Sequence, residues 1–201
     1  MAATRRNRSR SRRGEGRLLR AEILAAATEL LDASGDERAV TLRAVARRVG
    51  IAAPSIYPHF PDRPAIVLAL VQQGFTELAD RIRSAVATAG EDPDLRLVAA
   101  CRAYVDFARS RPERYRAMFG GAHDPEDPAA PVAEAMLILT ETLTDCVAAG
   151  RSTSADPAAD AISLWVGLHG LAHHYAVATS FRWPMDIVHR ITAPLSRLVV
   201  V

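Results

Sequence analysis

The sequence predicts an all-α protein of about nine helices. Along most of the chain, apolar residues recur at intervals of three and four, which is the spacing of one face of an α-helix. No run of useful length alternates polar with apolar residues, as a half-buried β-strand does. With 201 residues and 49% hydrophobic composition, the chain is long enough to bury a sizeable core.

The first expected helix follows a polar arm. Residues 1–16 are mainly Arg, Ser, Asn and Gly, so they hold too little apolar surface to offset the entropy of ordering and are expected to be disordered. From Arg17 onward, apolar residues at helical spacing predict an amphipathic helix of about 17 residues, which Gly35 ends.

A second, short helix is expected to begin after Thr41. Thr41 is a suitable N-cap, and Val40 and Val45 are placed to form a hydrophobic staple around it. Gly50 ends this helix, and only Ile51 separates it from the next. The pair is therefore a candidate helix-turn-helix.

A third helix is expected over residues 52–60. Pro54 is tolerated because it falls in the first turn, and Ile56 and Phe60 are spaced to face inward. The remaining helices are read from N-caps, apolar periodicity and the Pro, Gly and Asp clusters between them. They are expected at residues 62–89, 94–111, 112–119, 129–149, 157–181 and 185–200.

Charge is distributed unevenly along this nearly neutral chain. All 25 basic residues are arginine and face 23 acidic residues, for a formal net charge of +2. Residues 1–60 hold 12 Arg and 6 acidic residues, a net charge of +6, whereas residues 61–201 hold 13 Arg and 17 acidic residues, a net charge of −4. A basic first third predicts a contact with a polyanion there and a different task for the remainder.

Residues 23–66 fix apolar, glycine and aromatic positions together. The pattern includes Ile23, Val45-Ala46, Gly50-Ile51, Ser55-Ile56-Tyr57 and His59-Phe60. It resembles the DNA-binding domain of the TetR family of transcriptional regulators over that domain's whole length. The resemblance implies a three-helix helix-turn-helix domain and a double-stranded, near-palindromic DNA operator. It also implies that the protein binds this operator as a dimer and acts as a ligand-responsive repressor.

The candidate DNA contacts lie on the two short helices and at the start of the next one. In a helix-turn-helix the second helix enters the major groove, where small apolar residues can touch a thymine methyl and polar ones reach phosphates or base edges. The resemblance implies phosphate contacts for Tyr57 and His59 and a groove or phosphate contact for Arg43. The candidates are Thr41, Arg43, Ala53, Pro54, Ser55, Tyr57, His59 and Arg63.

Two further stretches carry family information. Residues 111–120 and the run Trp165-Val-Gly-Leu-His169-Gly170 resemble the C-terminal domain of the TetR subgroup marked by a Trp-x-x-x-His-Gly motif. The resemblance implies a homodimer through residues of about 157–200 and a small-molecule effector of unknown identity. Candidate pocket residues, each explained nearly as well by core packing, are Tyr104, Phe107, Tyr115, Met118, Phe119, Trp165, His169 and His173.

These patterns predict four segments. They are a disordered Arg-rich arm (1–16), a helix-turn-helix DNA-binding domain (17–62), a connecting helix (63–90) and a larger helical ligand-binding and dimerisation domain (91–201). Whether the arm itself contacts DNA stays open, and a non-specific nucleic-acid binder that relies on the arm alone is one alternative.

A second alternative is a helical metal-dependent sensor or enzyme. His169 and His173 lie four residues apart on one helical face, which is metal-ligand spacing, but no third ligand and no catalytic constellation accompany them. We therefore expect no enzyme activity, no metal and no cofactor.

Cys101 and Cys146 are too few for a disulfide framework, and no signal peptide is evident, so we expect a cytoplasmic protein. Residues 161–181 lack formal charge, but their polar side chains favour a buried helix over a membrane span.

Overall fold

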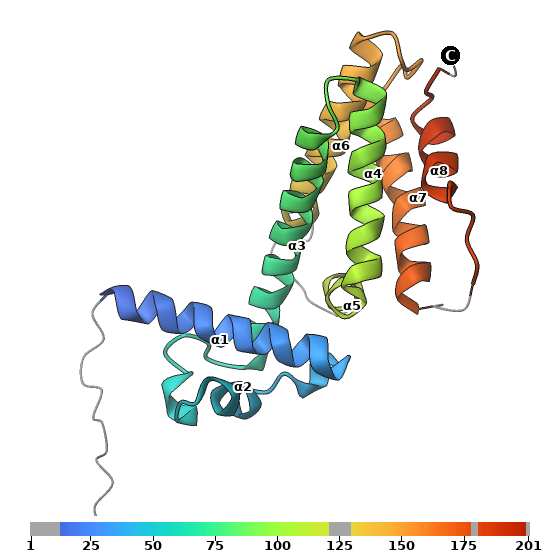
Figure 1. The fold of residues 1–201 in the computed structure, drawn as a ribbon. Coiled ribbons are helices and arrows are strands. Elements are labelled where there is room, and N and C mark those ends of the chain that lie inside the picture. Colours follow the sequence, from blue (N-terminus) through green and yellow to red (C-terminus); the bar gives the residue numbers. More distant parts are fainter. Residues whose placement is uncertain (1–12, 121–129, 178–180, 200–201) are drawn as a thin grey trace, which may run out of the picture. The chain divides into compact units, whose positions relative to one another are not determined.

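The computed structural model of the protein describes residues 13–120, 130–177 and 181–199. Within these ranges the regular elements are helices, so the prediction of an all-α fold is confirmed (Figure 1). Two short 3-10 helices, η1 (Glu37–Ala39) and η2 (Ala53–Ser55), lie on either side of α2 in the chain. The α-helices are α1 (Arg13–Ser34), α2 (Leu42–Val49), α3 (Arg63–Thr88), α4 (Pro93–Ser110), α5 (Pro112–Gly120), α6 (Ala130–Ala148), α7 (Pro157–Val177) and α8 (Ile187–Leu195).

The chain divides into two compact units, Met1–Leu70 and Val71–Val201. The first unit is built on the apolar face of α1, which packs against α2. Val40 and Val45, the two residues of the expected hydrophobic staple, are both fully buried. Gly50 ends α2 in the left-handed conformation, with φ of 78°, and its N–H donates to the Ala46 carbonyl at 3.0 Å. A residue with a Cβ is strained in this conformation, which is why a glycine stands here.

The helix expected over residues 52–60 is not an α-helix, and this prediction was wrong. The segment is the single turn η2 followed by further turns, so the described ranges hold eight α-helices. Pro58 has no N–H to donate to the Pro54 carbonyl, which an α-helix would require. Three bonds in the segment span three residues: Ser55 N–H to Ala52 O at 2.8 Å, Ile56 N–H to Ala53 O at 3.3 Å and His59 N–H to Ile56 O at 2.8 Å. A bond that spans four residues, as in an α-helix, forms at the end of the segment, from Phe60 N–H to Ile56 O at 3.0 Å.

Several boundaries also differ from the expected ones. Helix α1 begins at Arg13, so residues 13–16 continue the helix, while residues 1–12 of the expected arm lie outside the described residues. Helix α7 is described to Val177, and residues 178–180 lie outside the described ranges. Helix α8 spans Ile187–Leu195 instead of 185–200, and the chain leaves the helix one residue after Pro194, which has no N–H to donate to the Arg190 carbonyl.

The second unit is a helical bundle in which α4 packs against α5, α6, α7 and α8. Figure 1 shows α4, α6, α7 and α8 side by side. Asp92 caps α4, since its Oδ1 accepts a hydrogen bond from Asp94 N–H at 3.0 Å. Near the end of the bundle, Ser152 and Leu198 form an isolated antiparallel bridge.

Helix α7 contributes Leu164, Leu168 and Leu171 to the core of the second unit. Residues 161–177 therefore form a helix with a buried side, as the sequence indicated. No helix in the described ranges has the length and apolar character needed to cross a bilayer.

Candidate functional site

Helix α2 presents arginines on the face opposite its buried side. Val45 and Ala46 fix the helix to the core of the first unit, whereas Arg43 and Arg47 are exposed. Thr41 caps the helix, because its Oγ1 accepts a hydrogen bond from Ala44 N–H at 3.2 Å. The exposed face of α2 is thus held in place by its buried face and its cap.

The turn after α2 exposes polar groups from a fixed backbone. Ile56 and Phe60 are buried and anchor the segment, as expected from their spacing. Ser55 and Tyr57 are exposed between these anchors, and 56% of Tyr57 is accessible, so its ring is not part of the core. His59 is partly buried.

The two small residues of the candidate set also lie on this turn. Pro54 is exposed and Ala53 is partly buried, so both offer short apolar surface beside Ser55. Seven of the eight candidate DNA contacts, from Thr41 to His59, therefore lie on α2 and the turn that follows it.

Arg63, the eighth candidate, has partners inside its own unit. Its Nη2 donates to Glu37 O at 2.9 Å and to Glu37 Oε1 at 2.8 Å, and its Nε donates to Val40 O at 3.2 Å. These bonds join the start of α3 to the segment before α2. A phosphate contact by Arg63 would compete with them, so the structure gives this residue a role that its position in the sequence did not reveal.

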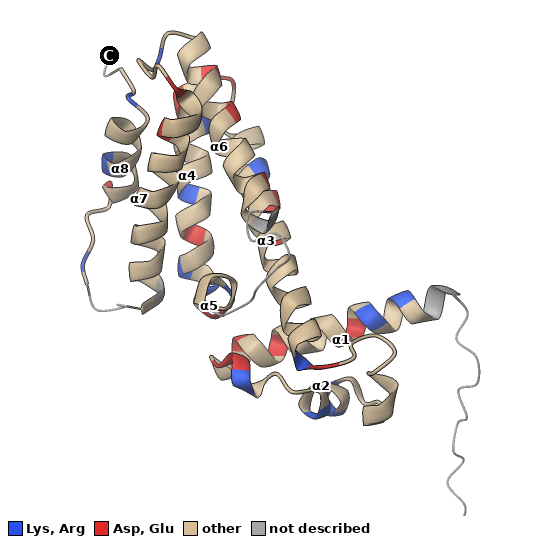
Figure 2. Ribbon diagram, turned by 180° about the vertical axis from the view of Figure 1, so that it is seen from behind, with Lys and Arg blue, Asp and Glu red and all other residues tan. Residues whose placement is uncertain are grey.

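The structure adds one arginine to the candidate surface. Arg47 lies four residues after Arg43 and is exposed like it, and that helical spacing is the signal that could have identified it. Arg48 points elsewhere and pairs with Glu29 at 2.7 Å. Figure 2 shows arginines on α2 and toward the N-terminal end of α1, with acidic residues near the other end of α1.

A second candidate site lies in the core of the second unit. The Tyr115 hydroxyl lies 2.7 Å from His169 Nδ1, the Tyr104 hydroxyl lies 3.2 Å from the same nitrogen, and the two hydroxyls are 3.3 Å apart. A neutral imidazole whose Nδ1 accepts from one hydroxyl satisfies this arrangement, with the second hydroxyl bonded to the first.

Aromatic rings surround this hydrogen-bonded group. The His169 ring centroid lies 4.6 Å from that of Phe119 and 5.2 Å from that of Trp165. The Trp165 Nε1 is buried and forms no hydrogen bond of normal geometry with a described residue, although it lies close enough to the Tyr104 hydroxyl to lower the pKa of that group slightly. Such an unused buried donor is costly in a protein interior and favours an additional acceptor at this place. We call Tyr104, Tyr115, Phe119, Trp165 and His169 the aromatic–histidine cluster.

Burial controls the protonation of this cluster. It lowers the pKa of His169, and the charge of the nearby His173 lowers it further. It raises the pKa of Tyr104 to about 12, and it raises the pKa of Tyr115 as well. At neutral pH the cluster is therefore an uncharged set of hydrogen-bonding groups.

The other three pocket candidates fall outside this cluster. Phe107 is buried in the core, with the Arg81 guanidinium 5.4 Å from its ring centroid. Met118 fills the close approach at Gly74, where an added Cβ would lie 2.8 Å from its Sδ. His173 is exposed, and no group of three or more His, Cys, Asp or Glu in the described ranges could hold a metal ion.

Comparison with known proteins identifies related sequences. The family model described as bacterial regulatory proteins, tetR family, matches residues 23–70, and the one described as the tetracyclin repressor-like C-terminal domain matches residues 97–197. The HTH-type transcriptional activator FasR of Mycolicibacterium smegmatis is 32% identical over 128 residues, which are 64% of this chain and 56% of FasR. The uncharacterized HTH-type transcriptional regulator YobS of Bacillus subtilis is 32% identical over 102 residues, 51% of this chain and 52% of YobS. The chain thus spans about half the length of the curated relatives it matches.

Solved structures match nearly the whole chain. A protein of unknown function from Rhodococcus sp. RHA1 has a TM-score of 0.77 and 27% identity, over 96% of this chain and 98% of its own. A tetR-family regulatory protein from Rhodococcus RHA1, at 21% identity and a TM-score of 0.65, shows the same fold over 89% of this chain and 95% of its own. Because the C-terminal family model alone matches half of the chain and the N-terminal model matches the helix-turn-helix, the chain belongs to the tetR family of bacterial regulatory proteins.

Proposed function

We propose that this protein is a transcriptional repressor that binds a near-palindromic DNA operator as a homodimer and responds to a small molecule. The observation that carries the proposal is the exposed surface of α2 and the turn after it. There Arg43, Ser55 and Tyr57 project from a backbone that Val45 and Ile56 hold against the core. Such a surface combines cationic and hydroxyl groups for phosphates with a rigid frame for base contacts.

The proposed contacts divide by chemistry. Arg43, Arg47, Tyr57 and His59 offer N–H or O–H donors to phosphate oxygens, and this contribution weakens as salt concentration rises. Ala53, Pro54 and Ser55 lie on the turn between the anchors and supply the short side chains that allow close approach to base edges. Thr41 and Arg63 act mainly by fixing the backbone: Thr41 caps α2, and Arg63 joins the start of α3 to the segment before α2.

The homodimer is proposed to form through residues of about 157–200. Helix α7 carries a second, exposed face in addition to its core face, with apolar side chains at helical spacing. On this face Ile162, Val166 and Val177 are 55%, 57% and 52% accessible. Apolar side chains aligned along one exposed helix face are typical of an interface between subunits.

A matched pair of substitutions tests the interface. Val166→Asp places a charge in the centre of the proposed contact and is expected to give a monomer in analytical ultracentrifugation. Leu137→Asp on α6 is the control, since Leu137 is 56% accessible and lies on another helix. A Val166→Asp protein that sediments as a dimer would contradict this interface.

The effector is proposed to bind at the aromatic–histidine cluster. Its members are uncharged donors and acceptors inside an apolar environment, which suits an uncharged ligand with an acceptor for Trp165 Nε1. By linkage, a ligand that prefers the non-binding form weakens DNA affinity by the same factor by which DNA weakens its own binding, typically about 5–150-fold. The relative FasR is named as an activator, so a reporter assay with the bound promoter must be able to detect both an increase and a decrease in transcription.

Selection of bound duplexes from a random pool tests the function as a whole. We expect enrichment of a motif with two-fold symmetry, whose half-sites lie about one helical turn apart or a multiple of it. In a gel shift with that motif, Arg43→Ala and Tyr57→Phe are expected to weaken the band while the circular dichroism spectrum stays helical. Arg83→Gln, which removes an exposed arginine from α3 outside the proposed DNA and subunit contacts, is the control. A pool without any enriched motif would refute specific DNA binding.

A further inference from the structure

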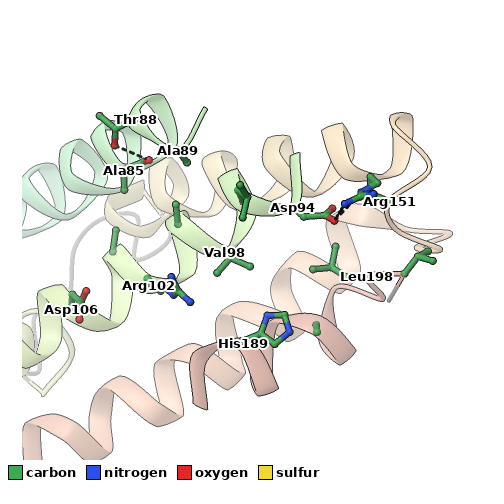
Figure 3. Close-up of a pocket in the computed structure, with 15 residues that line it drawn as sticks. Ala85, Thr88, Ala89, Asp94, Val98, Arg102, Asp106, Arg151, His189 and Leu198 are labelled. Atoms are coloured by element: carbon green, nitrogen blue, oxygen red, sulfur yellow. Dashed lines mark hydrogen bonds and ion pairs between the residues drawn. The ribbon is translucent and has the colours of Figure 1, made fainter. Parts of the chain in front are cut away.

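A groove of about 810 Å³ lies in the second unit, on the side of α4 away from the aromatic–histidine cluster. Its wall comes from the end of α3, one face of α4, the residue Arg151, and α8 with the segment after it (Figure 3). On α4, residues 95, 99, 102 and 106 face the groove at intervals of four, three and four. Tyr104 and Phe107 of the same helix are buried in the core, so α4 separates the groove from the cluster.

Most of the groove wall is apolar. Leu95, Val98, Ala193, Leu198 and Val199 line it, and Leu95 and Val199 are two of the large hydrophobic residues that the protein leaves exposed. Its volume falls within the range of about 300–1,000 Å³ that is usual for small-molecule sites. Apolar surface left open in a concave site of this size favours a ligand with an apolar body.

The charged groups of the groove differ in how they are paired. Arg151 is neutralised by Asp94, with Nη2 and Oδ2 2.8 Å apart. Asp106 pairs with Arg109 at 2.9 Å. Arg102, in contrast, has no carboxylate within ion-pair distance among the described residues. Figure 3 shows Arg102 on α4 and His189 on α8 projecting into the space between the two helices.

An unpaired guanidinium beside an imidazole fits one ligand chemistry well. A carboxylate accepts two parallel hydrogen bonds from a guanidinium, and an imidazole N–H can supply a third. A phosphate dianion would bring a second negative charge close to Asp106 with only one unpaired arginine to offset it. A monoanion is therefore the better match.

We propose that this groove binds a small organic carboxylate with an apolar body. The carboxylate lies between the Arg102 guanidinium and the His189 imidazole, and the body lies against Leu95, Val98 and Leu198. This site is separate from the effector site proposed above, because none of its lining residues belongs to the aromatic–histidine cluster.

Calorimetric titration of the full chain with naphthalene-2-carboxylate tests the proposal. The neutral amide naphthalene-2-carboxamide has the same apolar body and serves as the control ligand. We expect one saturable site per chain for the carboxylate and binding at least about tenfold weaker for the amide, because charge-assisted hydrogen bonds are the stronger ones. Equal affinity for the two ligands would overturn the proposal.

Two variants locate the binding. Arg102→Gln is expected to weaken carboxylate binding by about tenfold or more, whereas Arg83→Gln on α3, which removes the same charge outside the groove, leaves it unchanged. Ala99→Phe fills the groove without altering its charge and is expected to abolish binding. Thermal melting checks that each variant is folded.

A third variant distinguishes the groove from the aromatic–histidine cluster. Tyr115→Phe removes a hydroxyl from the cluster and is expected to leave carboxylate binding intact. Binding that is lost in Tyr115→Phe and kept in Arg102→Gln would assign the ligand to the cluster and refute the groove site. Operator binding, measured by gel shift on the same proteins, reports separately on the proposed regulatory function.

Discussion

Arg63 is the residue for which sequence and structure lead to different experiments. The sequence pattern places it among the phosphate contacts, whereas the structure gives its guanidinium three acceptors, on Glu37 and Val40. If the structural role dominates, Arg63→Ala destabilises the first unit without removing a DNA contact. Arg43 is the matched arginine, since it is exposed and no ion pair is formed with it in the described ranges.

The expected size of the effect follows from these contacts. Hydrogen bonds from charged donors contribute about 1.5–3 kcal/mol each when they are buried. The side chains of Arg63 and Glu37 are 38% and 27% accessible, so solvent screening reduces the ion pair to about 1 kcal/mol or less. We therefore expect Arg63→Ala to cost about 1–2 kcal/mol in all, whereas Arg43→Ala should change the free energy of unfolding by about 0.5 kcal/mol or less.

Urea unfolding and the salt dependence of operator binding measure the two roles separately. Arg43→Ala is expected to reduce the magnitude of the slope of log K against log salt by about 1.8, because the homodimer loses one phosphate contact of about 0.9 from each subunit, and Arg63→Ala is expected to leave the slope unchanged. If Arg63→Ala instead reduces the salt dependence of binding and leaves stability unaltered, the structural role is refuted and Arg63 is a DNA contact.

Three further predictions concern packing and protonation. Phe60→Ala is expected to cost about 3–5 kcal/mol because the ring is only 1% accessible, and it should abolish the cooperative unfolding of the first unit in urea. Gly167→Ala should lower the melting temperature, because its Cβ would lie 2.8 Å from Leu195 Cδ1 and 3.0 Å from Ile191 Cγ2. An unchanged melting temperature would argue against the close approach of α7 and α8. Burial lowers the pKa of His169, so the unfolded chain takes up its proton first and stability should fall as pH decreases below the ordinary histidine value of about 6.5. His169→Gln should flatten that part of the stability profile, and an unchanged profile would assign it to other groups.

Local chemistry accounts for what the sequence predicted well. Thr41, Gly50 and Asp62 act through bonds to residues within a few positions, and the structure shows each of them at the expected helix end. Ile56 and Phe60 were assigned to the core from their spacing and are buried even though the helix around them is absent. The spacing of apolar residues therefore predicted that these two side chains are buried, but it did not predict the type of turn on which they lie.

The features that sequence reasoning missed depend on two prolines or on distant partners. Pro54 alone is compatible with a helix start, but Pro58 removes the donor that the next turn needs. Arg63 finds its acceptors 23 and 26 residues earlier in the chain. The groove gathers residues from α3, α4 and α8, and nothing in the local sequence of any one of these helices indicates that they share a wall.

The bridge between Ser152 and Leu198 bears on hydrogen exchange. Thr153 N–H donates to Arg197 O at 3.0 Å, Val199 N–H donates to Arg151 O at 2.9 Å, and the Ser152 hydroxyl donates to Ser196 O at 2.7 Å. An amide that donates to a backbone acceptor exchanges only when that hydrogen bond opens. The amides of Thr153 and Val199 should therefore exchange with deuterium more slowly than amides without an acceptor, because these bonds tie the segment after α8 to the segment after α6.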